Sequence, residues 1–248
     1  MLFSLWGEEM YRATRDVDFL GFGDSSAQEM EKVFRDLCAV SVEDDGLVFK
    51  AESVVAETIR DAMEYGGVRV TLEARLAQAR IPIQADIGFG DAVTPAAEEI
   101  EYPSLLNALA PRIRAYPRET VVAEKYEASV RLGIANSRMK DFYDLWVMSR
   151  TFDFDGESLS EAIRKTFERR KMDLPKSAPT AFTSEFYEDK SKLTQWRAFL
   201  NKGLVTGEEI LLADVVNALR DFLLPPTDAL VSERAFKMRW SRAGSWTE

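Results

Sequence analysis

Residues 15–20 read Arg-Asp-Val-Asp-Phe-Leu, and this stretch decides the fold that we expect. Polar and apolar side chains alternate along it, which is the period of a β-strand with two unlike faces. Val17 and Phe19 are expected on one face, and Asp16 and Asp18 on the other. The sequence therefore predicts a strand with two carboxylates on the same side. Such a pair is common on exposed strands, and it also suits a bound cation.

A third carboxylate comes from a predicted hairpin further along the chain. Residues 68–74 and 81–87 both alternate, and the connection between them is short, which predicts two antiparallel strands. Asp86 lies in the second strand, between Ala85 and Ile87, which are expected to face the core. Three carboxylates that converge on one side of a sheet repel each other unless cations neutralise them. Magnesium suits such a site because it binds carboxylates together with water and substrate phosphates.

The chain divides into a β-rich front half and a helical back half. Between residues 40 and 100 the pattern is that of strands, including one expected at 47–53, after a Ser-capped helix that ends near Cys38. The inner face of that first helix is expected to carry Met30, Val33, Phe34 and Leu37. A helix is also expected over Leu2–Met10, and later helices near 104–110, 118–133, 138–150, 157–171, 183–201 and 207–222. Pro225-Pro226 should end the last helix and leave a loosely held tail. The fold class that follows is α+β.

Composition limits the chemistry. The 248 residues contain no histidine and a single cysteine, Cys38, so a Ser-His-Asp triad, a His-ligated metal and an iron–sulfur site are excluded. Any general base would be a carboxylate or a lysine. The net charge of −10 makes the whole chain a poor trap for nucleic acid. A basic cluster at 164–171 is either a solvated helix face or a phosphate-backbone patch. No apolar stretch reaches membrane-spanning length and the amino terminus lacks a secretory pattern, so we expect a cytoplasmic protein.

Two predicted helices carry further charged candidates. Lys125 lies among small and apolar residues of the helix at 118–133, so it is either a partly buried cation that needs an anion, such as a substrate phosphate, or a lysine whose stem lies along the apolar surface. Asp141 and Asp144 are three residues apart in the next helix and share a face. Asp144 has a simpler interpretation as the partner of Lys140 in an i,i+4 ion pair.

Four blocks, taken in order, resemble a known family. They are Ala-Thr-Arg-Asp-Val-Asp-Phe-Leu at 13–20, Ala-Asp-Ile-Gly-Phe-Gly-Asp at 85–91, Tyr-Pro at 116–117 through Ala-Glu-Lys-Tyr-Glu-Ala at 123–128, and Asn-Ser-Arg-Met-Lys-Asp-Phe-Tyr-Asp-Leu at 136–145. Over roughly residues 1–150 the chain resembles the AbiEii/AbiGii toxin branch of the nucleotidyltransferases. The last block is the most distinctive of the four.

The resemblance implies a polymerase-β-like core and a set of roles. A minimal mixed β-sheet core would span residues 1–115, with an appended helical subdomain at 116–248. Asp16 and Asp18 would match the metal-binding pair of the first motif, and Asp86 the third carboxylate, a metal ligand or base. Lys125 would match the lysine that holds the phosphates of the nucleotide, and Asp141 the acid of the Lys-Asp block. Substrate contacts would come from Arg15, Arg138, Lys140 and Asp144.

The resemblance also implies the reaction and its participants. Members transfer a nucleotide from a nucleoside triphosphate to an acceptor hydroxyl, some act on the acceptor end of transfer RNA, and they are commonly paired with an antitoxin encoded alongside. Mg²⁺ would be the cofactor. We expect no membrane association.

One departure from the family pattern leaves alternatives open. The family has a Lys-Gly-Gly or Gly-Ser turn ten or more residues before the Asp pair, and Gly7 is too close to that pair to serve. Either the true start lies upstream, or the chain lacks the first strand and its phosphate-binding turn. In the second case the fold would act as a catalytically impaired module that binds a nucleotide or an antitoxin. A third hypothesis for the function is a metal-dependent phosphohydrolase.

Overall fold

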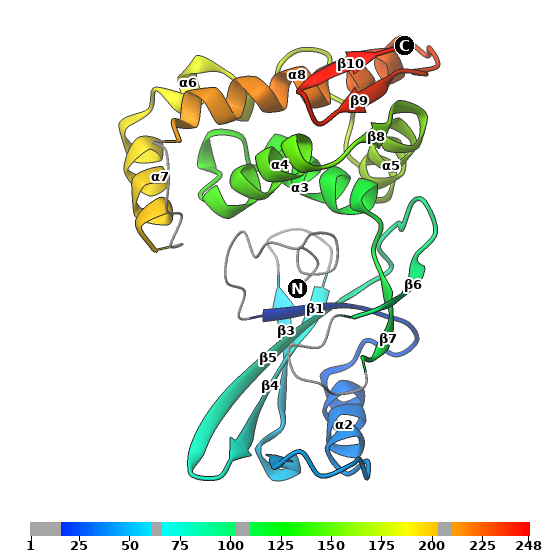
Figure 1. The fold of residues 1–248 in the computed structure, drawn as a ribbon, viewed down its shortest axis with the longest axis vertical. Coiled ribbons are helices and arrows are strands. Elements are labelled where there is room, and N and C mark those ends of the chain that lie inside the picture. Colours follow the sequence, from blue (N-terminus) through cyan, green and yellow to red (C-terminus); the bar gives the residue numbers. More distant parts are fainter. Residues whose placement is uncertain (1–15, 61–65, 103–109, 203–209) are drawn as a thin grey trace. The chain divides into compact units, whose positions relative to one another are not determined.

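The computed structural model describes residues 16–60, 66–102, 110–202 and 210–248 (Figure 1). These residues form two compact units, one ending at Asp91 and one running from Ala92 to Glu248. Within the described ranges, no helix has both the length and the apolarity needed to cross a membrane. The domain boundary predicted at residue 115 stays a prediction.

The first unit is built on a five-stranded mixed sheet. Its strands are β1 (Asp16–Gly21), β2 (Leu47–Phe49), β3 (Val55–Arg60), β4 (Gly66–Leu76) and β5 (Ala79–Phe89). The order is β1-β5-β4-β2, and β3 also pairs with β4. The β1–β5 pair is parallel, whereas β2, β3 and β5 run antiparallel to β4. The predicted strand at 15–20 and the predicted hairpin are both present.

Helix α2 (Ala27–Cys38) packs on one face of this sheet. Ser26 caps it, since its side chain accepts a hydrogen bond from the backbone N–H of Glu29 at 3.2 Å. Met30 is buried in a cluster with Val54, which precedes β3, and with the strand residues Val68, Val70, Leu72, Ala85 and Ile87. The predicted inner face was partly wrong: Val33 and Leu37 are exposed, because the stripe of α2 that meets the sheet consists of the buried Met30 with the partly buried Ala27, Phe34 and Cys38.

The strand predicted at 47–53 is shorter than expected. It ends at Phe49, and a 3₁₀ turn, η1 (Ala51–Ser53), follows it. The Ser53 hydroxyl donates to the carbonyl of Lys50 at 2.6 Å and accepts from the N–H of Glu73 at 2.9 Å. This side chain competes for the backbone groups that a longer strand would have used.

The second unit begins with a two-stranded ribbon and continues as packed helices. The ribbon pairs β6 (Glu98–Glu101) with β7 (Arg112–Ala115). The helices are α3 (Arg118–Leu132), α4 (Met139–Thr151), α5 (Gly156–Arg169), α6 (Ser184–Tyr187), α7 (Lys190–Lys202) and α8 (Leu212–Val231), with 3₁₀ turns η2 (Gly133–Ala135) and η3 (Thr180–Phe182). Their core is rich in aromatic rings, including Tyr126, Phe142, Phe167, Phe182 and Phe222, which are fully buried. Together with the mixed sheet, these helices confirm the α+β class.

The prediction that Pro225-Pro226 ends a helix was wrong, because α8 continues to Val231. A proline at 226 removes the N–H that would bond to the carbonyl of Phe222. That carbonyl instead accepts a hydrogen bond from the indole N–H of Trp246 at 3.1 Å. A distant side chain thus satisfies the backbone group that Pro226 leaves unpaired, which removes one cost of continuing the helix past residue 226.

The carboxyl-terminal tail was also predicted wrongly. It forms β9 (Arg239–Ser241) and β10 (Ser245–Thr247), which join β8 (Phe154–Asp155) in a small antiparallel sheet. Trp240 is buried, and its indole N–H donates to the carbonyl of Ser149 near the end of α4 at 2.6 Å. The tail is held because Trp240 is buried and satisfies an orphan carbonyl in the last turn of α4.

The helix predicted at 183–201 is two helices, α6 and α7. Asp189 lies between them and accepts the backbone N–H of Lys192 at 3.0 Å, so it starts a new helix rather than continuing the old one. The helix predicted over Leu2–Met10 lies outside the described residues. So do most of the helix predicted at 104–110 and the start of that predicted at 207–222.

Candidate active site

Asp18 and Asp86 are direct partners in the parallel β1–β5 ladder. Partners in a ladder project their side chains from the same face of a sheet. Ala85 and Ile87, which flank Asp86 in β5, point to the sheet face that α2 covers and are buried there. The two carboxylates therefore stand side by side on the opposite face, where Asp18 is exposed and the Asp86 side chain retains 24% of its exposure.

Arg69 on β4 extends this row. It is the ladder partner of Asp86, and it donates from Nε to Oδ1 at 2.8 Å and from a terminal nitrogen to Oδ2 at 2.7 Å. The next partner in the row, on β3, is Glu57. On the face opposite α2, one row across β1, β5, β4 and β3 thus carries the carboxylates of Asp18 and Asp86, the guanidinium of Arg69 and the carboxylate of Glu57. A cation bound by Asp86 would have to share its oxygens with Arg69 or displace it.

The structure describes the first motif only in part. The backbone of Asp16 is the ladder partner of Gln84, while its side chain and all of Arg15 lie outside the described residues. Among the side chains that are described, no group of three acidic residues is close enough to hold a metal. The metal site predicted from Asp16, Asp18 and Asp86 remains a prediction, and the described part of it is the Asp18–Asp86 pair.

In the second unit, Lys125 of α3 meets both acids of α4. Its Nζ lies 2.6 Å from Oδ1 of Asp141 and 3.1 Å from Oδ2 of Asp144. Both carboxylates are nearly inaccessible, and 19% of the Lys125 side chain is exposed. A partly buried lysine does need an anion here, and the protein supplies two of them.

The electrostatics of this group follow from its burial. Desolvation alone would lower the pKa of Lys125, but the charges of Asp144 and Asp141 and their hydrogen bonds outweigh it, so the pKa lies above its ordinary value. Lys125 therefore stays charged at physiological pH. Asp144 is a buried partner of Lys125, so its interpretation as an i,i+4 surface partner of Lys140 does not account for its environment. The phosphate-binding role of Lys125 remains a prediction.

The start of α4 is fixed from outside the helix. The side-chain oxygen of Asn136 accepts a hydrogen bond from the backbone N–H of Arg138 at 2.8 Å. The backbone carbonyl of Asn136 accepts a second one from Nζ of Lys192 at 2.9 Å. Lys192 is buried in α7 and also lies 5.5 Å from the ring centroid of Phe186. The Lys192–Asn136 hydrogen bond thus helps to fix the start of α4, and with it the positions of Asp141 and Asp144. Arg138 and Lys140 are exposed, and their predicted substrate contacts remain predictions.

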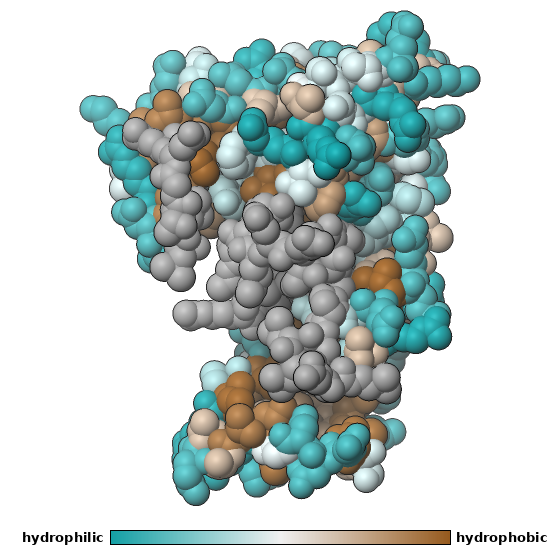
Figure 2. Space-filling model, in the orientation of Figure 1, coloured by the Kyte–Doolittle hydropathy of each residue, from teal (hydrophilic) through white to brown (hydrophobic). Residues whose placement is uncertain are grey.

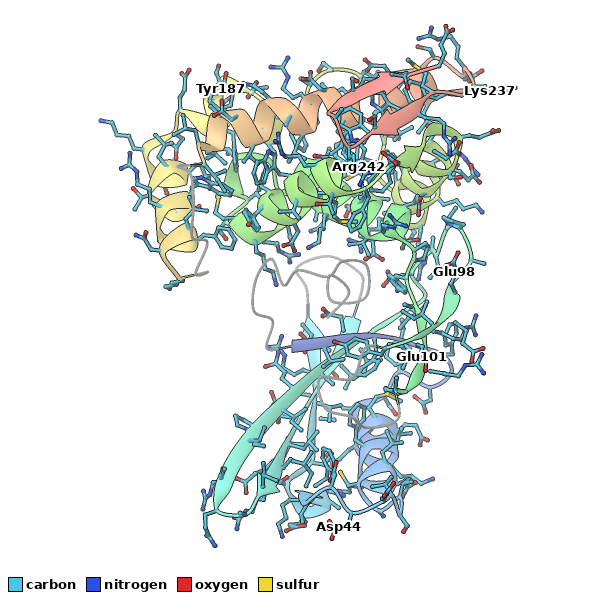
Figure 3. The ribbon with its side chains drawn as sticks, viewed as in Figure 1. Asp44, Glu98, Glu101, Tyr187, Lys237 and Arg242 are labelled. Atoms are coloured by element: carbon cyan, nitrogen blue, oxygen red, sulfur yellow. The ribbon has the colours of Figure 1, made fainter. Side chains whose placement is uncertain are left out.

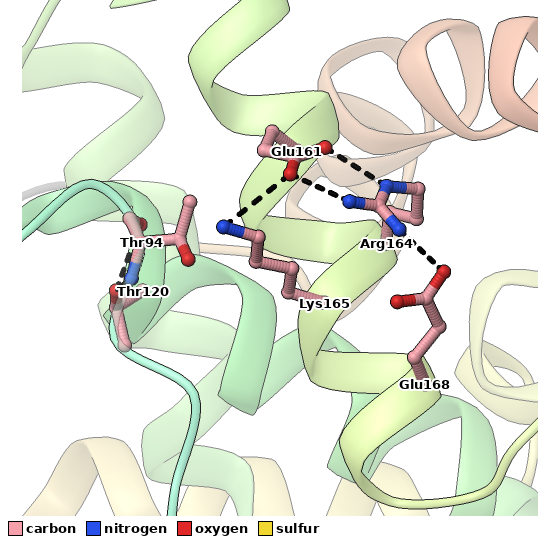
Figure 4. Close-up of polar contacts among 6 residues, drawn as sticks. All are labelled: Thr94, Thr120, Glu161, Arg164, Lys165 and Glu168. Carbon is pink, nitrogen blue, oxygen red and sulfur yellow. Dashed lines mark hydrogen bonds and ion pairs between the residues drawn. The ribbon is translucent and has the colours of Figure 1, made fainter.

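The basic cluster at 164–171 is largely ion-paired. Figure 4 shows Arg164 bound by Glu161 and Glu168, and Lys165 bound by Glu161. The hydrogen bond from Arg164 lowers the pKa of Glu161. At the end of α5, Arg170 binds the buried Glu127 at 2.8 Å. These pairs favour the solvated helix face over a free phosphate-backbone patch.

A comparison with protein-family models decides the family. The model described as nucleotidyl transferase AbiEii toxin, Type IV TA system, matches residues 1–229 of the 248. The chain belongs to the AbiEii family. It is therefore a nucleotidyltransferase of toxin–antitoxin type, as the four sequence blocks predicted.

Solved structures give a more distant comparison for this AbiEii chain. The protein JHP933 from Helicobacter pylori has a TM-score of 0.45 and 11% identity, over 93% of this chain and 86% of that one. A second Helicobacter pylori protein, provisionally described as a nucleotidyltransferase, has a TM-score of 0.46 and 11% identity, over 94% of this chain and 87% of that one. No curated protein matches the chain significantly.

Sequence reasoning missed two charged residues of this AbiEii chain. Arg69 could have been found from the hairpin, because strands that meet at residues 77–78 place 69 opposite 86. Glu127 has no accessible surface and joins Arg131 of its own helix to Arg170, the residue that follows α5. Its position one turn from residue 131 was a signal for an i,i+4 pair, but nothing local pointed to Arg170.

Proposed function

We propose that this AbiEii-family chain transfers a nucleotide from a nucleoside triphosphate to a hydroxyl of transfer RNA, and that Asp16, Asp18 and Asp86 bind the Mg²⁺ that the reaction needs. The observation that carries the proposal is the ladder pairing of Asp18 with Asp86 on the face that α2 leaves open. Two neighbouring carboxylates on an open face lower the cost of bringing a divalent cation to the substrate phosphates.

The donor set fits magnesium. All three proposed ligands are carboxylates, which this ion prefers over nitrogen or sulfur donors. When bound, Mg²⁺ lowers the pKa of a coordinated hydroxyl and neutralises charge on the leaving pyrophosphate. The residue that competes with it is Arg69, whose hydrogen bonds occupy one lone pair of each Asp86 oxygen and leave others available.

The chain's own residues supply the remaining steps. Since the sequence contains no histidine, a carboxylate is the available base of suitable charge, and we assign the acceptor hydroxyl's proton to Asp86. Arg69 fixes the carboxylate plane of Asp86, which orients the oxygen that receives the proton. Lys125, Asp141, Arg138, Lys140, Asp144 and Arg15 keep their predicted substrate roles in this proposal.

A transfer assay tests it. The full chain is incubated with labelled nucleoside triphosphates, Mg²⁺ and total transfer RNA, and label on the RNA is measured. Asp18→Asn and Asp86→Asn should each lose at least about 100-fold in rate, because each removes charge at the metal and reacting groups. Glu98→Gln is the control: it removes an equal charge from the exposed ribbon strand β6 (Figure 3). Equal labelling by Asp86→Asn and the unaltered chain would refute the proposal.

A second function has one observation in its favour. The forked hydrogen bond from Arg69 to Asp86 is what a site that no longer binds metal would show, and it favours a module that binds nucleotide without turnover. Calorimetry separates the two: nucleotide binding that needs Mg²⁺ supports transfer, whereas binding unchanged by a chelator supports the module. Release of free phosphate without RNA would indicate a phosphohydrolase.

The biological setting completes the proposal. A toxin-type nucleotidyltransferase acts where transfer RNA is found, so we place it in the cytoplasm with an antitoxin encoded beside it. Growth arrest on expression, relieved by co-expression of the neighbouring gene and absent for Asp86→Asn, is the expected result.

A further inference from the structure

The first unit exposes a group of large apolar side chains on strand β2 and on the end of β4 that pairs with it. The exposed fractions are 36% for Leu47, 42% for Phe49 and 46% for Leu76. Scattered exposed apolar residues are ordinary, but a contiguous group is not. Figure 2 shows hydrophobic surface gathered over this unit.

The strand register places these three side chains on one face of the sheet. Leu47 pairs with Leu76 and Phe49 pairs with Ala74 in the β2–β4 ladder. Ala74 is buried on the face that α2 covers, so Leu47, Phe49 and Leu76 extend that face beyond the helix. We call these three residues, Leu47, Phe49 and Leu76, the β2 patch.

Among the described strands, β2 pairs with β4 alone, which leaves its other backbone edge without a strand partner in this part of the chain. The N–H of Lys50 donates to the carbonyl of Glu73 on β4 at 2.9 Å. Because successive N–H groups of a strand point to opposite edges, the N–H of Phe49 points away from β4. The N–H of Leu47 is already bound by Asp45 at 2.9 Å. Phe49 therefore offers a donor and an acceptor to an added strand.

The charges beside the patch are acidic. Between residues 36 and 52 the exposed side chains Asp36, Glu43, Asp44, Asp45 and Glu52 accompany a single base, Lys50. Asp44 is labelled at this end of the unit in Figure 3. The nearby Arg75 and Arg80 pair with Glu73, and Arg75 is the ladder partner of Val48, whose side chain is on the other face. The patch thus combines apolar area with negative charge.

We propose that β2 and the β2 patch bind an extended segment of a partner protein, one in which apolar residues alternate with lysine or arginine. Such a segment would add a strand to the open edge through Phe49, place its apolar side chains on the patch and meet the acidic residues with its bases. A second copy of this chain suits the surface poorly, since a symmetric contact would bring the same five acids together.

The probe is a capped peptide of four lysines alternating with three valines, titrated into the full chain and followed by amide chemical shifts. Binding centred on β2 is expected, with shifts at Gly46–Lys50 and weaker affinity as salt rises from about 0.05 to about 0.5 M. The glutamate–valine analogue should bind at least about tenfold more weakly.

Three substitutions assign the contact. Phe49→Ala should weaken binding about fivefold by removing apolar area, and Phe49→Pro should weaken it about tenfold more, because it also removes the outward N–H. Val48→Ala, on the same strand with its side chain on the other face, should change affinity less than about twofold. If Phe49→Pro does not fold, the triple variant Glu43→Gln, Asp44→Asn, Asp45→Asn should still bind the lysine peptide at least about tenfold more weakly.

Several outcomes overturn the proposal. They are no binding at millimolar peptide, equal affinity for the two peptides, and equal effects of Phe49→Pro and Val48→Ala. A concentration-dependent dimer that Phe49→Ala dissociates would assign the surface to a second copy instead.

Discussion

Arg69 holds Asp86 by both carboxylate oxygens, with hydrogen bonds of 2.8 and 2.7 Å. The pair lies on the open face of the sheet, where 43% of the arginine side chain is exposed, so its net contribution to stability is below about 1 kcal/mol. Although the ion pair contributes little to stability, it fixes the orientation of the Asp86 carboxylate. Arg69 keeps Asp86 oriented beside Asp18 and offsets part of its negative charge.

Replacing Arg69 with glutamine should therefore tighten cation binding. Removal of one positive charge beside two carboxylates favours a divalent ion, and we expect about fivefold higher affinity for Mn²⁺, measured by electron paramagnetic resonance. Arg75→Gln is the control, because Arg75 is on the same strand and face but binds Glu73. Unchanged Mn²⁺ affinity in Arg69→Gln would show that these carboxylates do not hold the ion.

The Lys125 group predicts a large loss of stability. Lys125→Met would leave Asp141 and Asp144 buried without their cation, which should cost about 3–5 kcal/mol in the free energy of unfolding. Urea denaturation measures it. Lys165→Met, which breaks the exposed pair with Glu161, should cost under about 1 kcal/mol. Equal losses in the two variants would contradict the burial argument.

The sheet could be predicted because its signals are local. Alternation at 15–20 and across the hairpin was enough to place Asp18 and Asp86 on strands. The register of the β4–β5 hairpin was harder to predict than its strands. It depends on a two-residue turn in which Ala77 has a φ of 51°, a left-handed conformation that alanine rarely adopts. Nothing in an Ala-Gln pair predicts that turn, so the Arg69–Asp86 contact follows only when the alternation of the two strands is extended symmetrically to residues 77–78.

The errors in the helical unit have a common cause. A proline pair normally ends a helix, and a tail after it normally frays. Here Trp246 satisfies the carbonyl of Phe222 that Pro226 leaves unpaired, and Trp240 satisfies that of Ser149. These contacts join segments far apart in the sequence. Local patterns contain no information about them, and tertiary packing overrides the local preference.

Tyr126 predicts how stability changes in alkali. Burial raises its pKa to about 12 from an ordinary value of 10.0, because the phenolate would be charged in the core. The folded state thus keeps a proton that the unfolded chain loses, so stability is intact below pH 10 and falls as the pH rises from 10 to 12, by about 3 kcal/mol in total. Tyr126→Phe should flatten this fall in urea denaturation. A parallel decline in both proteins would assign the effect to other groups, such as Lys125.

The carboxyl-terminal strands should be necessary for the helical core. Trp240 is 2% exposed, its ring centroid lies 4.8 Å from that of Phe222, and its N–H binds the carbonyl of Ser149. Trp240→Ala should lower the free energy of unfolding by about 3–5 kcal/mol, since it opens a cavity and leaves a buried carbonyl unpaired. Trp240→Phe keeps much of the ring and should lose about 1–3 kcal/mol, mainly the hydrogen bond. The two variants therefore separate packing from the bond. Wild-type stability in Trp240→Ala would show that the tail is only loosely attached, as the sequence pattern alone had suggested.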